Sequence, residues 1–318
     1  MQLVTIDDIR AAAQRIRSHV VRTPLVPAPW GDPERPLWVK PESLQPIGAF
    51  KVRGAFNALT AVREQAGSVT DVVAYSSGNH AQAVAYAAAT FGLRAHIVMP
   101  EETPEVKVAA TRRHGARVVL CGAGEREAVA AEVVADTGGV MIPPFDHRDI
   151  IAGQGTIGIE IAEDLPEVAT VLVPVSGGGL ASGIGVAIKA LCPSAVVLGV
   201  EPELAADAAE SLRTGERVDW PVTLRNRTVA DGLRSQPSEL TFAHLRSVLD
   251  GMLTVTEDEI LSAVREFAQR GHLVAEPSGA VALAAYRRHT TPPGPTAVIL
   301  SGGNIEPRLL TKTLTPAE

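Results

Sequence analysis

The chain of 318 residues is short of cysteine, aromatic residues and lysine. Cys121 and Cys192 form no CxxC motif and have no paired histidines, so we expect buried thiols in a reducing compartment. The net charge of −7, without a basic cluster interleaved with aromatics, argues against nucleic-acid binding. No apolar run is long enough to cross a bilayer, and no secretory signal starts the chain. We therefore expect a cytoplasmic protein with no membrane partner.

One of the five lysines has an unusual setting. Lys51, in "IGAFKVRGA", follows a glycine turn and has no carboxylate neighbour in the sequence. Its neighbours Gly48, Ala49, Gly54 and Ala55 are small. Such a lysine is either packed by its aliphatic stem or a reactive amine, and the remaining motifs decide between the two.

Short β-branched runs alternate with helical stretches, which predicts an α/β fold with a mainly parallel sheet. The length favours two domains, or one unit with two lobes. Loop-like segments near 65–71 and at 143–149 predict a small mobile domain, 71–148, inserted into a large domain made of 1–70 and 149–318. Strands are expected at 72–77, 95–100, 117–121, 170–176, 195–201 and 297–302.

A glycine-rich turn begins at Ser176, where "TVLVPV" runs into "SGGGLASGIGVAIKAL". A strand, a glycine loop and a helix N-terminus together form an anion site, because free N–H groups and the helix dipole point at the ligand. The turn is not a P-loop, since no Gly-Lys-Ser/Thr follows, and Ser182 stands where the dinucleotide fingerprint needs a glycine. Glu201, at the end of the next predicted strand, keeps a ribose site open. We expect a phosphate site, with a mere tight turn as the alternative.

Two further turns follow predicted strands. "SSGNHAQAVAYAA" begins at Ser76, and capping by Ser77 or Asn79 accounts for one of its polar residues but not for four in succession. "SGGN" (301–304) also ends an apolar strand. Because ligands bind at the carboxyl ends of strands in open α/β sheets, we expect the three turns to face one crevice.

Seven segments then carry a resemblance in their order along the chain: "SLQPIGAFKVRGA", "SSGNHAQAVA", "IAGQGTIGIEI", "VPVSGGGLASGI", "TVTEDEI", "EPSGAVALAA" and "LSGGN". Together they resemble the pyridoxal-phosphate (PLP) enzymes of the serine/threonine dehydratase and serine racemase family, of the tryptophan-synthase-β fold type (fold type II). The resemblance extends from about residue 20 to 306. It implies two lobes, each with a mainly parallel twisted sheet flanked by helices, and a homodimer.

The resemblance also implies the cofactor site. Lys51 would form the Schiff base with PLP and take the α-proton of the substrate, because a poorly solvated amine has a lowered pKa. Asn79 would bond the ring hydroxyl, and Ser301 would sit at the pyridine nitrogen. Glu276 would lie near the ring, although a helix start before Pro277 accounts for it almost as well. The full cofactor set is Phe50, Lys51, Asn79, Ser176, Gly177, Gly178, Gly179, Leu180, Gly232, Glu276 and Ser301.

Substrate binding is implied at the second turn. Family racemases have serine at position 77, whereas threonine dehydratases often have alanine. A Ser77 hydroxyl opposite Lys51 would return a proton to the other face of the α-carbon, and helix capping is the equally weighted alternative. The substrate carboxylate would bind the N–H groups of Ser76, Ser77, Gly78, Asn79 and His80.

A divalent-cation site is implied by "VEPELAADAAESL". Glu201, the Ala205 carbonyl and Asp207 have the family spacing, and their oxygen atoms suit Mg²⁺ or Ca²⁺. The alternative is two solvated acids at a strand end and a helix start.

The implied activity is dehydration of L-threonine and L-serine to the 2-oxo acid and ammonia. The alternatives within the family are a serine racemase and a threo-3-hydroxyaspartate dehydratase. Outside it, a nicotinamide-dependent oxidoreductase would need Glu201 on a ribose, and a phosphate-ligand sensor would not need the chemistry of Lys51.

Several positions depart from the family pattern. Ile47 replaces a common threonine and is expected to alter the pocket wall near the substrate. The segment 233–242, adjacent to the substrate, matches poorly and leaves the side-chain preference open. His147 would favour an acidic substrate, or it is an exposed loop histidine. The chain stops soon after "SGGN", so we expect no C-terminal regulatory domain.

Overall fold

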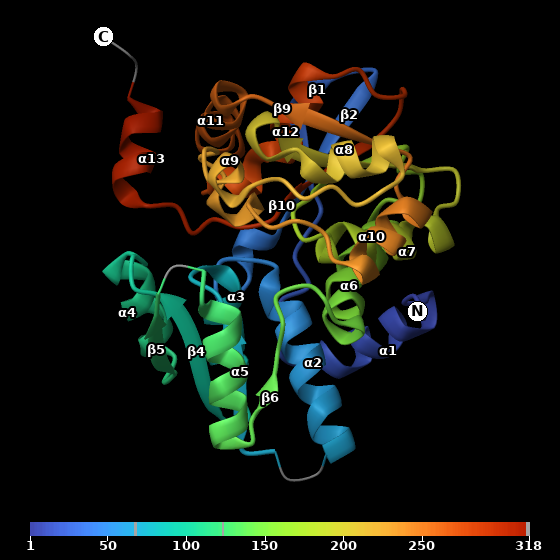
Figure 1. Ribbon diagram of the computed structural model, residues 1–318. Helices are drawn as coiled ribbons and strands as arrows, with labels where there is room; N and C mark the ends of the chain where they lie inside the picture. Colours follow the sequence, from blue (N-terminus) through green and yellow to red (C-terminus); the bar gives the residue numbers. More distant parts are fainter. Residues whose placement is uncertain (67–68, 123, 316–318) are drawn as a thin grey trace.

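The computed structural model describes residues 1–66, 69–122 and 124–315. Its strands form two sheets, which confirms the predicted α/β fold (Figure 1). The strands are β1 (Val26–Asp32), β2 (Arg35–Pro41), β3 (Asp71–Tyr75), β4 (Arg94–Pro100), β5 (Arg117–Cys121), β6 (Val140–Met141), β7 (Thr170–Pro174), β8 (Val196–Pro202), β9 (Gly251–Val255) and β10 (Thr296–Leu300).

The larger sheet has six strands in the order β1-β2-β10-β7-β8-β9. Its strands are parallel except for the hairpin of β1 and β2. Every residue of β7 and β10 is buried, which is why these central strands read as continuous apolar runs in the sequence. The edge strand β1 contains Pro27 and Pro29, which edge positions tolerate, and the prediction missed it.

The smaller sheet has four parallel strands in the order β5-β4-β3-β6. All of its residues fall within 71–141. Apolar residues of this sheet, such as Val72 and Ile97, share one hydrophobic cluster with Phe56 and Leu59 of α2 (Lys51–Ala66). The core around the smaller sheet therefore includes a helix that precedes it in the chain.

Helices cover the sheets, and several begin at clear local signals. Thr256 and Glu259 form a capping box that starts α11. The α-helices besides α2 are α1 (Ile6–Ile16), α3 (Asn79–Thr90), α4 (Glu105–Arg113), α5 (Arg126–Thr137), α6 (Arg148–Asp164), α7 (Gly179–Leu191), α8 (Asp207–Thr214), α9 (Val222–Arg225), α10 (Glu239–Val248), α11 (Glu257–Glu266), α12 (Pro277–Arg288) and α13 (Pro307–Leu314). Short helical turns are η1 (Glu42–Leu44), η2 (Glu203–Ala205), η3 (Asp231–Leu233) and the π-helical η4 (Phe267–Gly271).

A buried cluster of charges fixes the start of α2. Arg53 Nε lies 2.7 Å from Glu42 Oε2, and Arg53 Nη1 lies 2.6 Å from Glu160 Oε1. Lys40 Nζ lies 2.6 Å from Glu160 Oε2. Two cations and two carboxylates balance, which offsets the large desolvation penalty of burying them. The cluster joins the first turn of α2 to the larger sheet and to α6.

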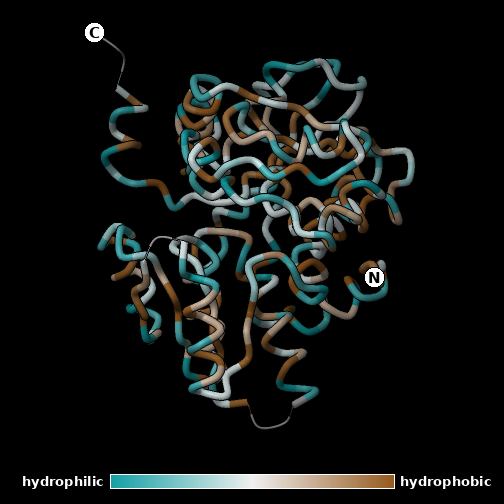
Figure 2. The backbone as a smooth tube through the Cα atoms, in the orientation of Figure 1, coloured by the Kyte–Doolittle hydropathy of each residue, from teal (hydrophilic) through white to brown (hydrophobic). Residues whose placement is uncertain are grey.

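The interior of both parts is apolar. Figure 2 shows hydrophobic stretches inside the two halves and hydrophilic stretches along the outer loops. Within the described ranges, no helix has the length and apolar character needed to cross a membrane. Cys121 and Cys192 are both free and buried, as predicted.

Candidate active site

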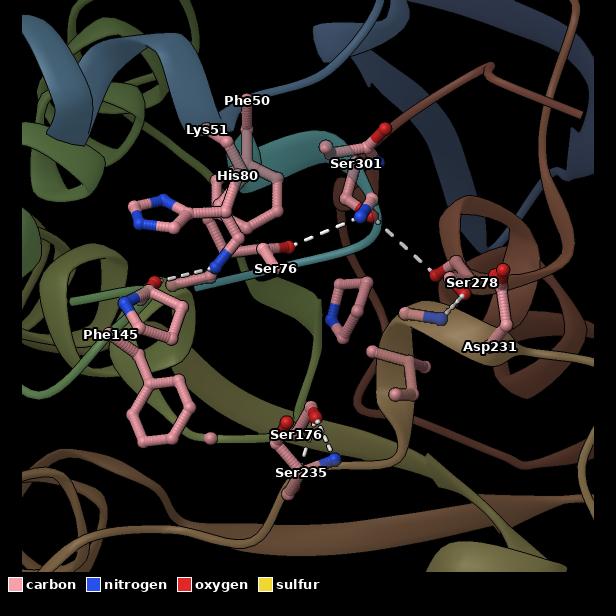
Figure 3. Close-up of a pocket in the computed structure, with 18 of the residues that line it drawn as sticks. Phe50, Lys51, Ser76, His80, Phe145, Ser176, Asp231, Ser235, Ser278 and Ser301 are labelled. Atoms are coloured by element: carbon pink, nitrogen blue, oxygen red, sulfur yellow. Dashed lines mark hydrogen bonds between the residues drawn. The ribbon is translucent and has the colours of Figure 1, made fainter. Parts of the chain in front are cut away.

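A cavity of about 210 Å³ lies where the ends of the two sheets meet (Figure 3). The starts of α2, α3, α7 and α12 and the end of β10 contribute to its walls. It brings together all of the predicted cofactor and substrate residues: Phe50, Lys51, Ser76, Ser77, Gly78, Asn79, His80, Ser176, Gly177, Gly178, Gly179, Leu180, Gly232, Glu276 and Ser301.

Three glycine-containing turns face this cavity, each at the carboxyl end of a strand, as predicted. The turns that begin at Ser176 and Ser301 end strands of the larger sheet, whereas the turn at Ser76 ends β3 of the smaller one. The crevice therefore forms between the carboxyl ends of strands from the two sheets.

Lys51 is the first residue of α2 and projects into the cavity. Its Nζ donates a hydrogen bond to the carbonyl oxygen of Pro144 at 2.7 Å and lies 5.0 Å from the centre of the Phe50 ring. Burial of the amine, which has no ion-pair partner among the described residues, lowers its pKa to about 8. Lys51 is thus placed and tuned as a nucleophile or base.

The turn from Ser176 to Gly179 forms a backbone cradle at the start of α7. Gly178 is the N-cap and has φ of +87°, a conformation that favours glycine. A Cβ on Gly177 would lie 2.3 Å from the Phe145 ring, so a side chain there would collide. The free N–H groups and the helix dipole make this cradle an anion site, and its close approach suits a phosphate.

The turn at Ser76 presents polar groups without using them as helix caps. Gly78 is the N-cap of α3, and no side chain caps this helix, so the capping hypothesis for Ser77 and Asn79 is wrong. Ser76 Oγ accepts from the N–H of Gly78 at 3.2 Å. The Ser77 side chain lines the cavity and makes no hydrogen bond to another described residue. Its hydroxyl is therefore free for a ligand.

His80 is buried in the first turn of α3, with only 3% of its surface exposed. Burial, and then the positive charge of Lys51, lower its pKa to about 3. The neutral ring bonds the carbonyl oxygen of Ile142 through Nε2 at 2.8 Å, where the nitrogen must be the donor. His80 is therefore not a proton donor at neutral pH.

Glu276 is a buried carboxyl at the cavity wall. Burial, and then the charge of Asp231, raise its pKa to about 7. It is the N-cap of α12 but makes no capping hydrogen bond, and its Oε1 instead accepts from Asn79 Nδ2 at 2.7 Å. The helix-start explanation of Glu276 is thus incomplete, because its carboxyl faces the ligand cavity. Ser301 is also buried, and its Oγ donates to the carbonyl oxygen of Ser278 at 3.5 Å.

Some cavity residues had no clear signal in the sequence. Ser235 brackets the phosphate cradle, because its N–H donates to Ser176 Oγ at 3.0 Å and its carbonyl accepts from the same oxygen at 2.9 Å. It lies in the segment 233–242. The sequence predicts that this segment lies near the substrate but assigns no role to Ser235. Pro144 and Phe145 belong to the loop-like segment 143–149, which the sequence predicts only as a connection between the domains. The sequence gives no signal that Lys107, Arg126 and Asp231 line the cavity.

Glu201, Ala205 and Asp207 lie together outside the cavity, from the end of β8 to the start of α8. Glu201 and Asp207 are each 1% exposed, so the description as solvated acids is wrong. Glu201 accepts from the N–H groups of Ala208 and Ala209, whereas neither oxygen of the buried Asp207 carboxylate has a hydrogen-bond partner among the residues that the structure describes.

Burial is the main cause of the raised pKa of both acids. It raises the pKa of Asp207 to about 6, and burial together with Asp207 raises that of Glu201 well above its usual range. No group of three His, Cys, Asp or Glu side chains suited to a metal occurs in the described part of the chain. Because Glu201 does not line the cavity, the ribose-binding hypothesis has no support.

Neither Ile47 nor His147 contributes to the substrate pocket, so the expected effect of Ile47 on its wall and the acidic-substrate hypothesis for His147 are wrong. The Ile47 side chain belongs to the hydrophobic cluster around the smaller sheet and does not line the cavity. His147 is the N-cap of α6, where its Nδ1 accepts from the Asp149 N–H at 3.2 Å, and it too lies outside the cavity. His147 is exposed and caps a helix, so the alternative of an exposed histidine is the one that the structure supports.

Comparison with known proteins agrees with this site. Residues 16–302 match the family described as "Pyridoxal-phosphate dependent enzyme". The chain belongs to this family, and it has the fold-type-II architecture.

Among curated proteins, the chain is 43% identical over 305 residues to an L-threonine ammonia-lyase of Geobacter sulfurreducens, covering 94% of this chain and 75% of that protein. It is 37% identical over 320 residues to a serine racemase of Oryza sativa subsp. indica, covering 97% and 93%. Among solved structures, maize serine racemase has a TM-score of 0.91 at 36% identity, covering 98% of this chain and 97% of that one. A threonine deaminase of T.th. has a TM-score of 0.89 at 42% identity, covering 95% and 99%.

Proposed function

We propose that this protein is a PLP-dependent ammonia-lyase that eliminates water from L-threonine and L-serine, giving the 2-oxo acid and ammonia. One observation carries the proposal. The buried amine of Lys51 faces a cavity that has a phosphate cradle on one side and the N-terminus of α3 on the other. The relatives named L-threonine ammonia-lyase support L-threonine as a substrate.

The residues present fit PLP. The cradle at Gly177 and Gly178 leaves no room for a side chain, as close binding of a phosphate requires. We assign to the cofactor the set predicted from the sequence, all of which lines the cavity: Phe50 would pack on the ring, Asn79 would bond its hydroxyl, and Ser301 would hold its pyridine nitrogen. PLP supplies an electron sink that makes the α-proton of an attached amino acid acidic. A serine hydroxyl does not strongly favour a protonated pyridine, so the sink is weak and suits prompt loss of the β-hydroxyl.

The protein's own groups then divide the remaining tasks. The N–H groups from Ser76 to His80 bind the substrate carboxylate at the positive end of α3. The neutral Lys51 Nζ would take the α-proton of the substrate as a base. Glu276 holds the Asn79 amide in orientation. The neutral His80 donates to Ile142 and keeps the floor of the cavity rigid.

A second activity, racemisation of serine, is favoured by Ser77. Its hydroxyl lines the cavity, makes no hydrogen bond to another described residue and is not a helix cap. From the face opposite Lys51 it would return a proton and invert the α-carbon. A third, dehydration of threo-3-hydroxyaspartate, is favoured by Arg126, a cation on the cavity wall with which a β-carboxylate would pair.

A divalent cation, Mg²⁺ or Ca²⁺, also belongs to the proposal. The support is the buried Asp207 carboxylate, which accepts no hydrogen bond from the described part of the chain and lies next to Glu201 and the Ala205 carbonyl. Oxygen ligands suit these ions, and the ion would offset the repulsion between the two acids. In the metal-free state, Asp207→Asn removes that repulsion and should raise the melting temperature, while abolishing any further rise on adding Mg²⁺. A wild-type melting temperature that ignores both Mg²⁺ and chelator would exclude the site.

We further propose a large domain of 1–70 and 149–318 and a mobile small domain of 71–148. The separation of the two sheets along the chain supports this division. A homodimer, as the family resemblance implies, and a cytoplasmic location, as the sequence predicts, complete the proposal. Sedimentation velocity tests the dimer, and small-angle scattering with and without serine tests the domain movement.

The decisive experiment follows keto acid and D-amino acid together from L-serine, L-threonine and L-threo-3-hydroxyaspartate, with PLP and Mg²⁺ present. Keto acid from serine and threonine with negligible D-isomer establishes the dehydratase. Abundant D-serine or a strong preference for hydroxyaspartate establishes an alternative. Borohydride reduction followed by peptide mapping should place the cofactor on Lys51, and Lys51→Ala is the control. A colourless protein without a reduced adduct would overturn the proposal.

A further inference from the structure

Arg225 is a buried cation whose hydrogen bonds go to backbone carbonyls, and its charge opposes the effect of burial on the pKa of the nearby Asp207. It ends α9, is 6% exposed and has no carboxylate within ion-pair distance in the described ranges. Its Nε donates to the carbonyl oxygen of Trp220 at 3.1 Å, and its Nη1 donates to the carbonyl oxygen of Arg234. The planar guanidinium therefore joins Trp220, which precedes it by five residues, to Arg234, which follows it by nine.

The segment on one side of Arg225 leads to the phosphate cradle. Arg234 directly precedes Ser235, whose N–H and carbonyl both bond Ser176 Oγ at 3.0 and 2.9 Å (Figure 3). Arg234 is held from its other end as well, since its Nη2 donates to the Thr228 carbonyl at 2.6 Å. Displacing the Arg234 carbonyl would therefore displace the backbone that fixes the first residue of the cradle.

The segment on the other side leads to the proposed cation site. α9 packs against η2, which ends at Ala205. Just upstream of α9, Trp220 Nε1 donates to Glu210 Oε2 at 2.6 Å and the Val218 N–H donates to Ser211 Oγ at 2.8 Å. Both acceptors belong to α8, whose first residue is Asp207. Residues 218–225 are thus bound to the two elements that a cation would order.

We infer that Arg225 is a positioning residue that connects the cation site to the phosphate cradle. The inference rests on the proposed cation site. A cation bound by Glu201, the Ala205 carbonyl and Asp207 fixes η2 and the start of α8, and these fix α9. Arg225 then holds the Arg234 carbonyl, and Ser235 holds Ser176. By linkage, Mg²⁺ and PLP each raise the affinity of the protein for the other.

The test measures the dissociation constant of PLP for the apoenzyme by absorbance, in Mg²⁺ and in chelator. For the wild-type protein we expect Mg²⁺ to lower this constant by about fivefold, the lower end of common coupling strengths. Arg225→Met should raise it and bring the effect of Mg²⁺ within about twofold. Arg225→Lys, whose single ammonium cannot hold both carbonyls in a fixed fork, should restore only part of the coupling.

The control variant is Arg265→Met, because Arg265 also donates to a backbone carbonyl, that of Thr313 at 2.8 Å, but this carbonyl belongs to α13 and not to the stretch from Trp220 to Ser235. It should retain the wild-type ratio of the two constants. A purely structural Arg225 would raise both constants by the same factor and leave their ratio unchanged, which would overturn the inference. If Arg225→Met does not fold by circular dichroism, the Lys variant decides by the same ratio. The melting temperature of the wild-type apoenzyme separates the proposals: no response to Mg²⁺ removes the cation site and the inference with it, whereas a response without coupling removes the inference alone.

Discussion

The amide of Asn79 is clamped between two side chains of the opposite part of the molecule. Its Nδ2 donates to Glu276 Oε1 at 2.7 Å, and its Oδ1 accepts from Asn304 Nδ2 at 2.7 Å. Asn79 starts α3 next to the smaller sheet, whereas Glu276 precedes α12 and Asn304 follows β10 of the larger one. One amide hydrogen remains available for the ring hydroxyl of the cofactor.

Glu276 should make the stability of the apoenzyme depend on pH. Its folded pKa of about 7 lies above the ordinary 4.5, so its contribution is fully present below pH 4.5 and is lost as pH rises to about 7. The rise of the Glu276 pKa from 4.5 to about 7 corresponds to ~3 kcal/mol of unfolding free energy. Glu276→Gln, which keeps an acceptor for Asn79, should remove this loss. Urea unfolding at pH 5 and pH 8 measures it, and equal pH dependence in both proteins would contradict the assignment.

The rate at which PLP reconstitutes the apoenzyme should rise with pH through the pKa of Lys51. With a pKa of about 8 in place of 10.5, about 300-fold more of the amine is neutral at pH 7. We expect the second-order rate to rise about tenfold between pH 7 and pH 9 and then level off. Stopped-flow absorbance follows the reaction, and a rate still rising tenfold per unit above pH 9 would show an unperturbed amine.

Gly177→Ala should weaken PLP binding by about tenfold, or ~1.4 kcal/mol, because the new methyl meets the Phe145 ring at 2.3 Å. Equilibrium titration of the apoenzyme measures the loss. Adding Phe145→Ala should recover part of it. Gly251→Ala is the matched control, since its Cβ would meet only Leu198, at an ordinary 3.4 Å. Equal affinity in the Gly177 variant and the control would show that the cradle does not bind the phosphate closely.

Ser77→Ala should separate the two activities. Dehydration of L-threonine should stay within about threefold of wild type, because the Ser77 hydroxyl caps no helix and bonds no described residue. Formation of D-serine should fall at least tenfold, as expected when an acid–base group is lost. Chiral chromatography measures both products. A variant that kept all of its D-serine formation would remove Ser77 from proton transfer.

The sequence signals found the central strands and the convergent turns, since both depend on local residue types. Buried parallel strands such as β7 need apolar runs, and glycines are needed wherever backbone approaches a ligand. The edge strand β9 was missed because only one of its residues is fully buried, so its pairing with β8 decides its conformation. The role of Ser235 depends on a segment 59 residues from Ser176, and the Pro144 contact uses a carbonyl, which every residue has. Such contacts leave no mark on residue type.

The buried charges at the start of α2 attach one part of the site to the larger sheet, whereas another part belongs to the smaller sheet. Arg53 clamps the first turn of α2 to Glu42 and Glu160, so Lys51 keeps its place relative to the phosphate cradle. The turn at Ser76 is carried by the smaller sheet. A change in the separation of the two sheets would therefore move the turn at Ser76, which binds the substrate carboxylate, relative to Lys51 Nζ, which is held by the larger sheet. The range of this movement would then limit the size of the substrate that fits between the turn at Ser76 and Lys51.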